Sequence, residues 1–466
     1  MTAGECMANV KLIIKIVVIG LLTGVILVAL GLVSSVINSR QAYRDQAVQS
    51  ISASYASGQT IVGPIFVQPY TETRHEVTVG TDGKPKVTSS TSQGSYLAFP
   101  DTLNVQGTMT PSERYHGLYR VSVYEFQTKL TGVIKVSGLP NAANVTYGQP
   151  YLAMSVSDVR GLVGRPEIKV NNASLEIKQG GTISGTAMSQ YGSKEGGDGW
   201  QPNLQMALPE TARGVNGTYN FSLDMDLAGT QHLAIAPVGA TNHIEMMSSW
   251  ASPLFGGQFL PRAREVNDHG FHAVWDVSSL ASGTQQQIAS RTGNIDTVNV
   301  DLITSIDPYK LSDRAVKYGI LFVLLTFGGF FVFEVMKQLP IHPVQYLLVG
   351  FGLAIFFLLL ISLSEHIEFG LAYLCASIAC IGLLTFYLTY VLRSVTRGVA
   401  FGAMLTLLYA AIYGLLISED NALVLGSVML FVILAAVMFI TRNVDWYKGA
   451  ESARPYSPPP PPPPAI

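Results

Sequence analysis

The stretch "LLLISLSEHIEFGLAYL", Leu358 to Leu374, sets two carboxylates and a histidine between two long apolar runs. These polar residues are Glu365, His366 and Glu368. Inside a bilayer they would mark a proton or metal site, whereas between two spans they would only mark a turn in water. The apolar segments on either side therefore decide how the stretch is interpreted.

The composition indicates a membrane protein with a large water-facing part. Charged residues make up 13% of the 466 residues, about half of the roughly 25% usual in globular proteins. The deficit is local, because residues 318–440 hold only eight Asp, Glu, Lys and Arg, whereas residues 40–317 have the composition of a soluble protein. The net charge of -2 argues against nucleic-acid binding, which needs a basic surface to neutralise phosphates.

Six transmembrane helices are predicted, since a span needs about 20 mostly apolar residues. The first, residues 12–33, is interrupted only by Lys15 and has no clear A-x-A site after it, which favours an uncleaved signal anchor over a cleaved signal peptide. The other five form a C-terminal bundle over residues 318–440, at 318–336, 344–361, 369–391, 399–417 and 422–440.

The loops predict the orientation, because short cytoplasmic loops collect Lys and Arg. Lys337 follows the second span and "RSVTR" follows the fourth, whereas "SEHIE" and "SEDN" contain no Lys or Arg. With six spans, residues 1–11 and 441–466 lie in the cytoplasm and residues 34–317 in the bacterial periplasm. The tail ends in "SPPPPPPPAI", which is either an extended ligand for a proline-binding module or a disordered end.

Short alternating runs between Gly, Pro, Asn and Asp predict a β-rich external domain, preceded by an outward continuation of the first helix. "IFVQPYTETRHEV" (65–77) aligns without a gap with "LAIAPVGATNHIE" (233–245), and "YHGLYRV" resembles "DHGFHAV". Two related sandwich-like modules would explain this internal similarity. Chance is the rival explanation, because Pro and Gly recur in any β protein.

No motif points to catalysis, a cofactor or a metal. G-x-S-x-G, H-E-x-x-H and the phosphate-binding loop are all absent from the sequence, and they are the usual signs of such sites. Six of the eight histidines lie in the external domain but lack the paired Cys/His spacing of structural zinc, so we interpret them as turn or surface residues. The three cysteines, Cys6, Cys375 and Cys380, leave the external domain without a disulfide.

The candidate functional residues are therefore few. Glu334 is the only acid within a predicted span and is either a functional intramembrane acid or the partner of Lys337 one turn away. The turns "SEHIE" and "SEDN" are either simple water-facing turns or one outer surface that docks against the β-rich domain. That candidate outer-turn cluster consists of Glu365, His366, Glu419 and Asp420.

The chain resembles the CreD family of bacterial inner membrane proteins. The likeness is carried by "SGQTIVGPIFVQPY", "RYHGLYRVSVYEFQTKLTG", "SDVRGL", "SWASPLFGGQFLP", "DPYKLSDRAVKY", "FEVMKQLPIHPVQYLLVG", "SLSEH", "ISED" and "RNVDWY". The resemblance implies a role in cell-envelope integrity, expression under a two-component system, and effects on tolerance to colicins and β-lactams. It implies no reaction and no site residues, and the proline-rich tail departs from the family pattern.

The sequence thus favours a non-enzymatic membrane protein whose β-rich domain binds or braces an unidentified periplasmic or membrane protein or a lipid. The alternative is a transporter or flippase-like protein that handles a lipid or cell-wall precursor. A cavity among the spans would favour transport, and tight packing would favour a scaffold. A hydrolase would need a Ser, His or Asp cluster in one cleft of the external domain.

Overall fold

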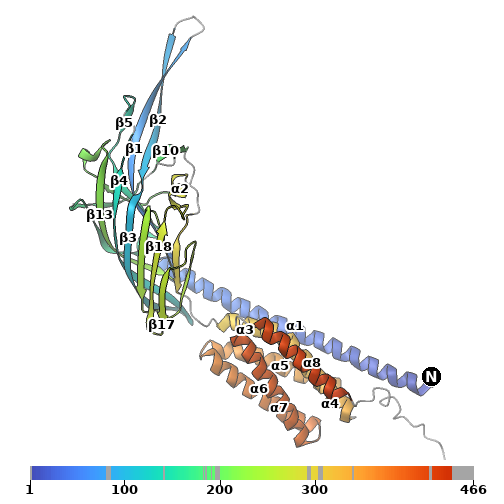
Figure 1. Cartoon of the computed structure of the whole chain (residues 1–466). Coiled ribbons are helices and arrows are strands. Elements are labelled where there is room, and N and C mark those ends of the chain that lie inside the picture. The colour runs from blue at the N-terminus through green and yellow to red at the C-terminus, as the bar shows by residue number, and fades with distance from the viewer. Residues whose placement is uncertain are drawn as a thin grey trace, which may run out of the picture. The chain divides into compact units, whose positions relative to one another are not determined.

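The computed structural model describes residues 3–79, 85–139, 142–181, 183, 186–189, 192–194, 200–290, 295–302, 308–337, 341–418 and 422–442. The chain divides into two compact units (Figure 1). The helical unit comprises Met1–Tyr43 and Ile306–Ile466, and the β-rich unit comprises Arg44–Ser305. The proline-rich tail and the turn residues Glu419 and Asp420 lie outside the described residues.

Seven helices contribute to the helical unit within the described part of the chain. They are α1 (Ala3–Ser54), α3 (Pro308–Lys317), α4 (Gly319–Lys337), α5 (Pro343–Ser364), α6 (Phe369–Val391), α7 (Val395–Ile417) and α8 (Ala422–Thr441). Helix α1 continues well past the predicted first span, as the lack of Gly and Pro before Gly58 predicted.

The predicted spans are confirmed in part. Among the described residues, four helices are long and apolar enough to cross a membrane, namely α1, α5, α6 and α7. Helices α3 and α4, bent by 42° at their junction, would make a fifth. The apolar stretch described in α8, Val424–Ala435, is shorter than a full span, so the sixth span stays a prediction.

Aromatic rings fill the interior of the helical unit. The Phe322 ring of α4 meets the Tyr409 ring of α7 edge-on, with 4.5 Å between ring centroids, and Phe356 of α5 meets the same tyrosine at 4.7 Å. The Phe330 ring of α4 and the Tyr346 ring of α5 are also in contact, with 4.6 Å between their centroids. These five side chains are almost fully buried, so they form a packed core between α4, α5 and α7.

Two sheets make up the β-rich unit in the described residues. The eleven strands of the first sheet are β1 (Gln59–Val79), β2 (Pro85–Ala98), β5 (Val145–Tyr147), β6 (Tyr151–Val156), β9 (Ile177–Gln179), β10 (Thr186–Ser189), β11 (Gly192–Lys194), β12 (Leu204–Ala207), β14 (His232–Ile235), β16 (Pro253–Gly257) and β19 (Val298–Leu302). The short helix α2 (Thr284–Ala289) precedes β19.

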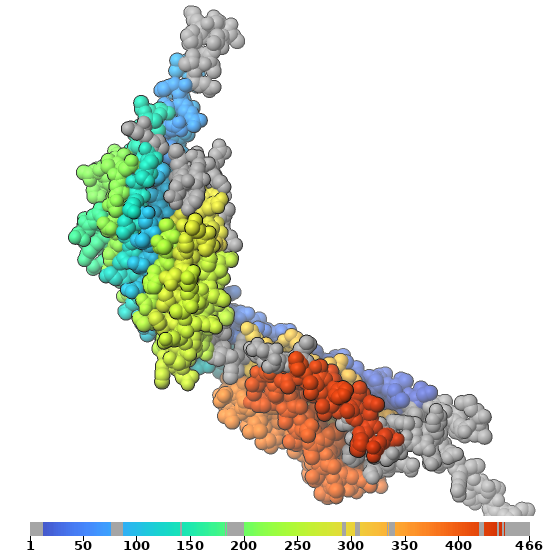
Figure 2. Space-filling model, viewed as in Figure 1, coloured from blue at the N-terminus to red at the C-terminus, as the bar shows by residue number. Residues whose placement is uncertain are grey.

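The second sheet has eight described strands in the order β17-β18-β15-β3-β4-β13-β7-β8. Their bounds are β3 (Pro100–His116), β4 (Tyr119–Val136), β7 (Leu162–Val170), β8 (Ala173–Leu175), β13 (Gly217–Thr230), β15 (Thr241–Ser248), β17 (Ala263–Asn267) and β18 (Gly270–Ser278). In Figure 2 their order can be followed by colour, from the green of β13 through teal β4 and blue β3 to yellow-green β15 and β18.

One hydrophobic core joins the two sheets. Phe66 of β1 stacks on Tyr219 of β13 with 5.3 Å between centroids, and Phe255 of β16 packs edge-on against Trp275 of β18 at 5.8 Å. Residues of both sheets belong to the same buried cluster. The predicted division into two sandwich-like modules is therefore not seen, because both sheets cover a single core.

The two pairs of similar sequence segments differ in whether they also have similar structures. Residues 65–77 lie within the single strand β1, whereas residues 233–245 leave β14 in the first sheet and enter β15 in the second. The two segments therefore do not share a structure. Gly117 and Gly270, however, both adopt positive φ at tight hairpin turns, β3–β4 and β17–β18, so that part of the internal similarity reflects similar turn chemistry.

Candidate functional site

The candidate intramembrane acid Glu334 is buried and has three partners. Its carboxylate forms an ion pair with Lys15 of α1, and its side chain is 5% exposed. The Tyr346 hydroxyl donates a hydrogen bond to Oε2 at 2.8 Å, and the Ile341 N–H donates to Oε1 at 3.2 Å. The side chain of the partner expected from the sequence, Lys337, lies outside the described residues.

Sequence reasoning missed Lys15 because it is far from Glu334 along the chain. The only local signal was that Lys15 interrupts an otherwise apolar span. A charge costs several kcal/mol in an apolar setting unless it is paired. A lone base in one span and a lone acid in another are therefore candidates for each other.

Glu365 directly follows Ser364, the last residue of α5. Its side chain is 9% exposed, and Arg40 Nε of α1 lies 3.5 Å from its Oε1. The Tyr309 hydroxyl of α3 donates to the same oxygen at 3.3 Å. Glu365 thus joins α1, α3 and α5, which a simple turn in water would not require.

The rest of the predicted outer-turn cluster is less engaged. His366 is exposed, and its ring Nδ1 lies 3.2 Å from the Ser362 carbonyl oxygen of its own helix. Glu368 is exposed at the start of α6. Because Glu419 and Asp420 fall outside the described residues, the meeting of all four cluster residues stays a prediction.

The two ion pairs are spaced along α1 by about the thickness of a bilayer. Lys15 and Arg40 are 25 positions apart, which corresponds to about 37 Å at 1.5 Å per helical residue. A bilayer has a hydrocarbon core of about 30 Å and a total thickness of about 40–45 Å. One pair would therefore lie near each membrane face, where a charged side chain costs least.

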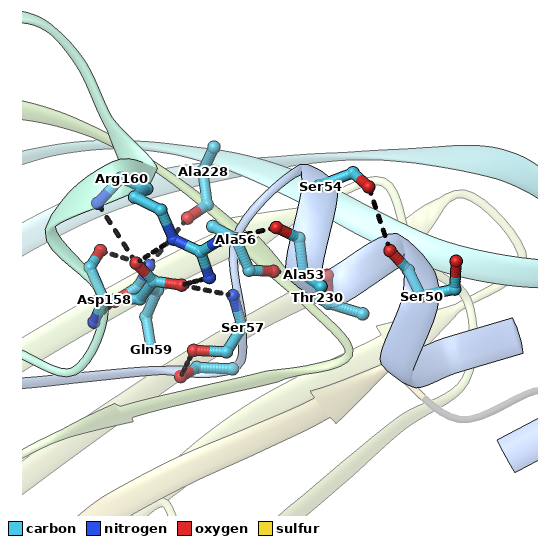
Figure 3. Close-up of polar contacts among 11 residues, drawn as sticks. Ser50, Ala53, Ser54, Ala56, Ser57, Gln59, Asp158, Arg160, Ala228 and Thr230 are labelled. Carbon is cyan, nitrogen blue, oxygen red and sulfur yellow. Dashed lines mark hydrogen bonds and ion pairs between the residues drawn. The ribbon is translucent and has the colours of Figure 1, made fainter. Parts of the chain in front are cut away.

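The C-terminal end of α1 is fixed within the β-rich unit by Asp158 and Arg160 (Figure 3). Asp158 accepts hydrogen bonds from the Ser57 N–H at 3.0 Å and from Arg160 Nη2 at 2.6 Å. Arg160 Nη1 donates to the Ala53 carbonyl, one of the last carbonyls of the helix, at 2.5 Å. A guanidinium in this place caps carbonyls that have no partner within the helix.

Other residues around this end complete the anchor. Gln59 donates to the carbonyls of Asp158 and Ala228, both at 3.0 Å, and Thr230 Oγ1 donates to the Ala56 carbonyl at 2.6 Å. The Arg160 guanidinium holds the pKa of the Asp158 carboxyl well below its usual range. We call this group, Ala53, Ser57, Gln59, Asp158, Arg160 and Thr230, the helix-end clamp.

Apolar contacts support the clamp on the face of the second sheet. Ile51 of α1 packs with Val121 and Val123 of β4 in a small buried cluster. The Arg114 guanidinium lies 5.8 Å from the centre of the Tyr55 ring, a cation–π contact. The end of α1 therefore covers part of this outer face.

Three histidines of the β-rich unit pair with carboxylates across strands. The pairs are His232 with Asp301 at 2.5 Å, His243 with Asp276 at 2.7 Å, and His272 with Glu245 at 2.9 Å. In "HGFH" the first histidine lies in a turn and the second in β18. No group of three or more His, Cys, Asp and Glu in the described part of the chain could hold a metal ion.

Comparison with known proteins places the chain in a family. The family model for the inner membrane protein CreD matches residues 11–447. The inner membrane protein CreD of Escherichia coli (strain K12) is 37% identical over 434 residues, covering 91% of this chain and 91% of that protein. The chain belongs to the CreD family. With several helices apolar enough to cross a bilayer, this CreD-family member is a multi-pass inner membrane protein.

The stretches that carry the CreD likeness also carry the polar contacts described above. "FEVMKQLPIHPVQYLLVG" contains Glu334 and Tyr346, "SLSEH" contains Glu365, and "SDVRGL" contains Asp158 and Arg160. In this CreD-family chain each of these stretches contributes to holding α1, either against other helices or within the β-rich unit.

Proposed function

We propose that this CreD-family protein is a non-enzymatic scaffold of the inner membrane that contributes to cell-envelope integrity. Its β-rich unit lies in the periplasm and acts as a binding module, and its helices anchor that module. The observation that carries the proposal is the aromatic core of the helical unit, in which Phe322, Phe356 and Tyr409 close the space between α4, α5 and α7.

This packing weighs against the transporter or flippase alternative. A transport path needs polar groups along its length, whereas the rings between these helices are nearly inaccessible to solvent. The buried acid Glu334 is already paired with Lys15. Recognition is therefore assigned to the β-rich unit, whose surface carries the polar side chains.

A topology experiment tests the periplasmic assignment. Alkaline phosphatase fused within residues 85–139 of the full chain is expected to be active, and green fluorescent protein at the same positions to be dark, because Lys and Arg gather in the loops predicted to be cytoplasmic. Alkaline phosphatase and green fluorescent protein, inserted at the same positions, give opposite signals for the two compartments. Fluorescence without phosphatase activity would discard the assignment and the binding role built on it.

A second experiment tests the role of the outer turn. Glu365→Gln combined with His366→Ala is expected to leave membrane insertion intact but to weaken complementation of the envelope defect, scored as β-lactam tolerance, because Arg40 and Tyr309 lose their charged partner. His366→Ala alone is the matched control, since that ring is exposed and its Nδ1 lies within hydrogen-bond distance of the Ser362 carbonyl oxygen four residues earlier. Full complementation by the double variant would leave the turn with no function beyond connection.

A further inference from the structure

A hollow of about 670 Å³ lies on the outer face of the second sheet, within the β-rich unit. Its volume is in the range of small-ligand sites, about 300–1,000 Å³. It is formed by five strands, β3, β4, β7, β13 and β15. Its lining includes Gln106, Gln127, Lys129, Glu167, Asp224, Asp226 and Glu245.

The floor of this hollow, here called the sheet groove, is a grid of polar side chains fixed by strand register. Gln106 of β3 lies opposite Lys129 of β4, which lies opposite Asp224 of β13. In the next row along the strands, Gln127 of β4 lies opposite Asp226 of β13. Neighbouring side chains in a row are about 5 Å apart, and rows are about 7 Å apart.

Contacts within the groove orient several of these groups. Lys129 Nζ lies 3.2 Å from Asp224 Oδ1, and Gln106 donates to Glu245 at 3.1 Å. The His272 ring next to Glu245 holds the pKa of that carboxyl below its usual range. The side chains of Gln127 and Asp226 make no hydrogen bond or ion pair with other residues that the structure describes, so their polar atoms face the hollow's solvent.

The chemistry of the lining selects a class of ligand. Four carboxylates against two bases disfavour phosphates and other anions, and the polar floor disfavours an acyl chain. No metal cluster exists in the described residues. An extended peptide would pair with backbone groups at a sheet edge. This floor instead offers side-chain amides and hydroxyls, which donate and accept hydrogen bonds, and carboxylates, which accept them, and sugar hydroxyl groups can use all three.

We infer that the sheet groove binds a neutral oligosaccharide chain, with Gln127 and Asp226 as direct contacts. This inference rests on the proposed binding role of the β-rich unit and names its ligand class. Apolar side chains at the rim, Met247 and Val163, are about half exposed and are placed to cover the carbon face of a sugar ring.

The test uses the full-length protein in lipid nanodiscs and short oligomers of N-acetylglucosamine as the probe. Saturation-transfer NMR and calorimetry are expected to detect binding that falls at least tenfold in Gln127→Ala/Asp226→Ala. The matched control, Thr131→Ala/Ser222→Ala, changes another cross-strand pair of the same two strands outside the groove and is expected to bind as the unchanged protein does. Thermal unfolding of both variants establishes that they are folded.

Envelope complementation in parallel separates this inference from the proposed function. Loss of both sugar binding and complementation in the groove variant supports both. If sugar binding is lost but complementation is retained, the groove site stands and the proposed role fails. If the unchanged protein binds no oligomer, or if the groove and control variants bind equally, the oligosaccharide site is overturned, and complementation alone then decides the binding role.

Discussion

Replacing Lys15 by methionine is expected to destabilise the helical unit by about 3 kcal/mol, the low end of the cost of removing one partner of a buried ion pair, because the Lys15 side chain is 31% exposed. Methionine preserves the length of the side chain but leaves Glu334, whose side chain is 5% exposed, without a positive charge. The remaining partners, the Tyr346 hydroxyl and the Ile341 N–H, are neutral and cannot offset a full negative charge in an apolar setting. Thermal unfolding of the full chain in detergent should show a midpoint lower by roughly 10 °C.

The double variant Lys15→Met/Glu334→Gln provides the control. It removes both charges and preserves the hydrogen bond from Tyr346, so most of the lost stability should return. If the double variant is as unstable as Lys15→Met alone, the loss comes from altered packing rather than from an unpaired carboxylate. Equal midpoints for Lys15→Met and the unchanged protein would show that the pair contributes nothing.

The sequence predicted the helices well where charges or helix breakers frame an apolar run. The span predicted at 369–391 coincides with α6, and α5 extends the predicted 344–361 to Pro343–Ser364. Helix α7 begins before the predicted 399 because Arg397 is accommodated within its first turns, where it donates to the Leu392 carbonyl at 3.3 Å. The bend between α3 and α4 has no sequence signal that we can identify.

Long-range partners were beyond the reach of sequence patterns. The pairs Lys15–Glu334 and Arg40–Glu365 each join α1 to helices from the other end of the chain, and no periodicity encodes such a contact. The same holds for the clamp at Asp158, where a short stretch far along the chain receives the end of α1. Local alternation predicted strands, but it could not show that two sheets share one core.

The second large loss of stability is expected from a change in the helix-end clamp. Replacing Asp158 by asparagine is expected to destabilise the β-rich unit by about 2–3 kcal/mol at pH 7, the typical contribution of hydrogen bonds to a charged group. The change removes the charge that holds Arg160, which in turn caps the Ala53 carbonyl. Hydrogen exchange in the full chain should show faster exchange at the Ser57 amide, which donates to Asp158. Asp276→Asn, at an exposed carboxylate paired with His243, is the control and should change stability little.

The same clamp predicts a pH dependence of known sign. The pKa of Asp158 is lower in the folded chain than its usual value near 3.8, so folding favours the ionised form. Its contribution to stability is then fully present above the unfolded pKa and is lost as pH falls through the folded one. The difference in unfolding midpoint between the unchanged protein and Asp158→Asn should be constant from pH 7 to about 5 and should shrink below about 4. A difference that stays constant through the acid range would show that Asp158 acts through shape rather than through its charge.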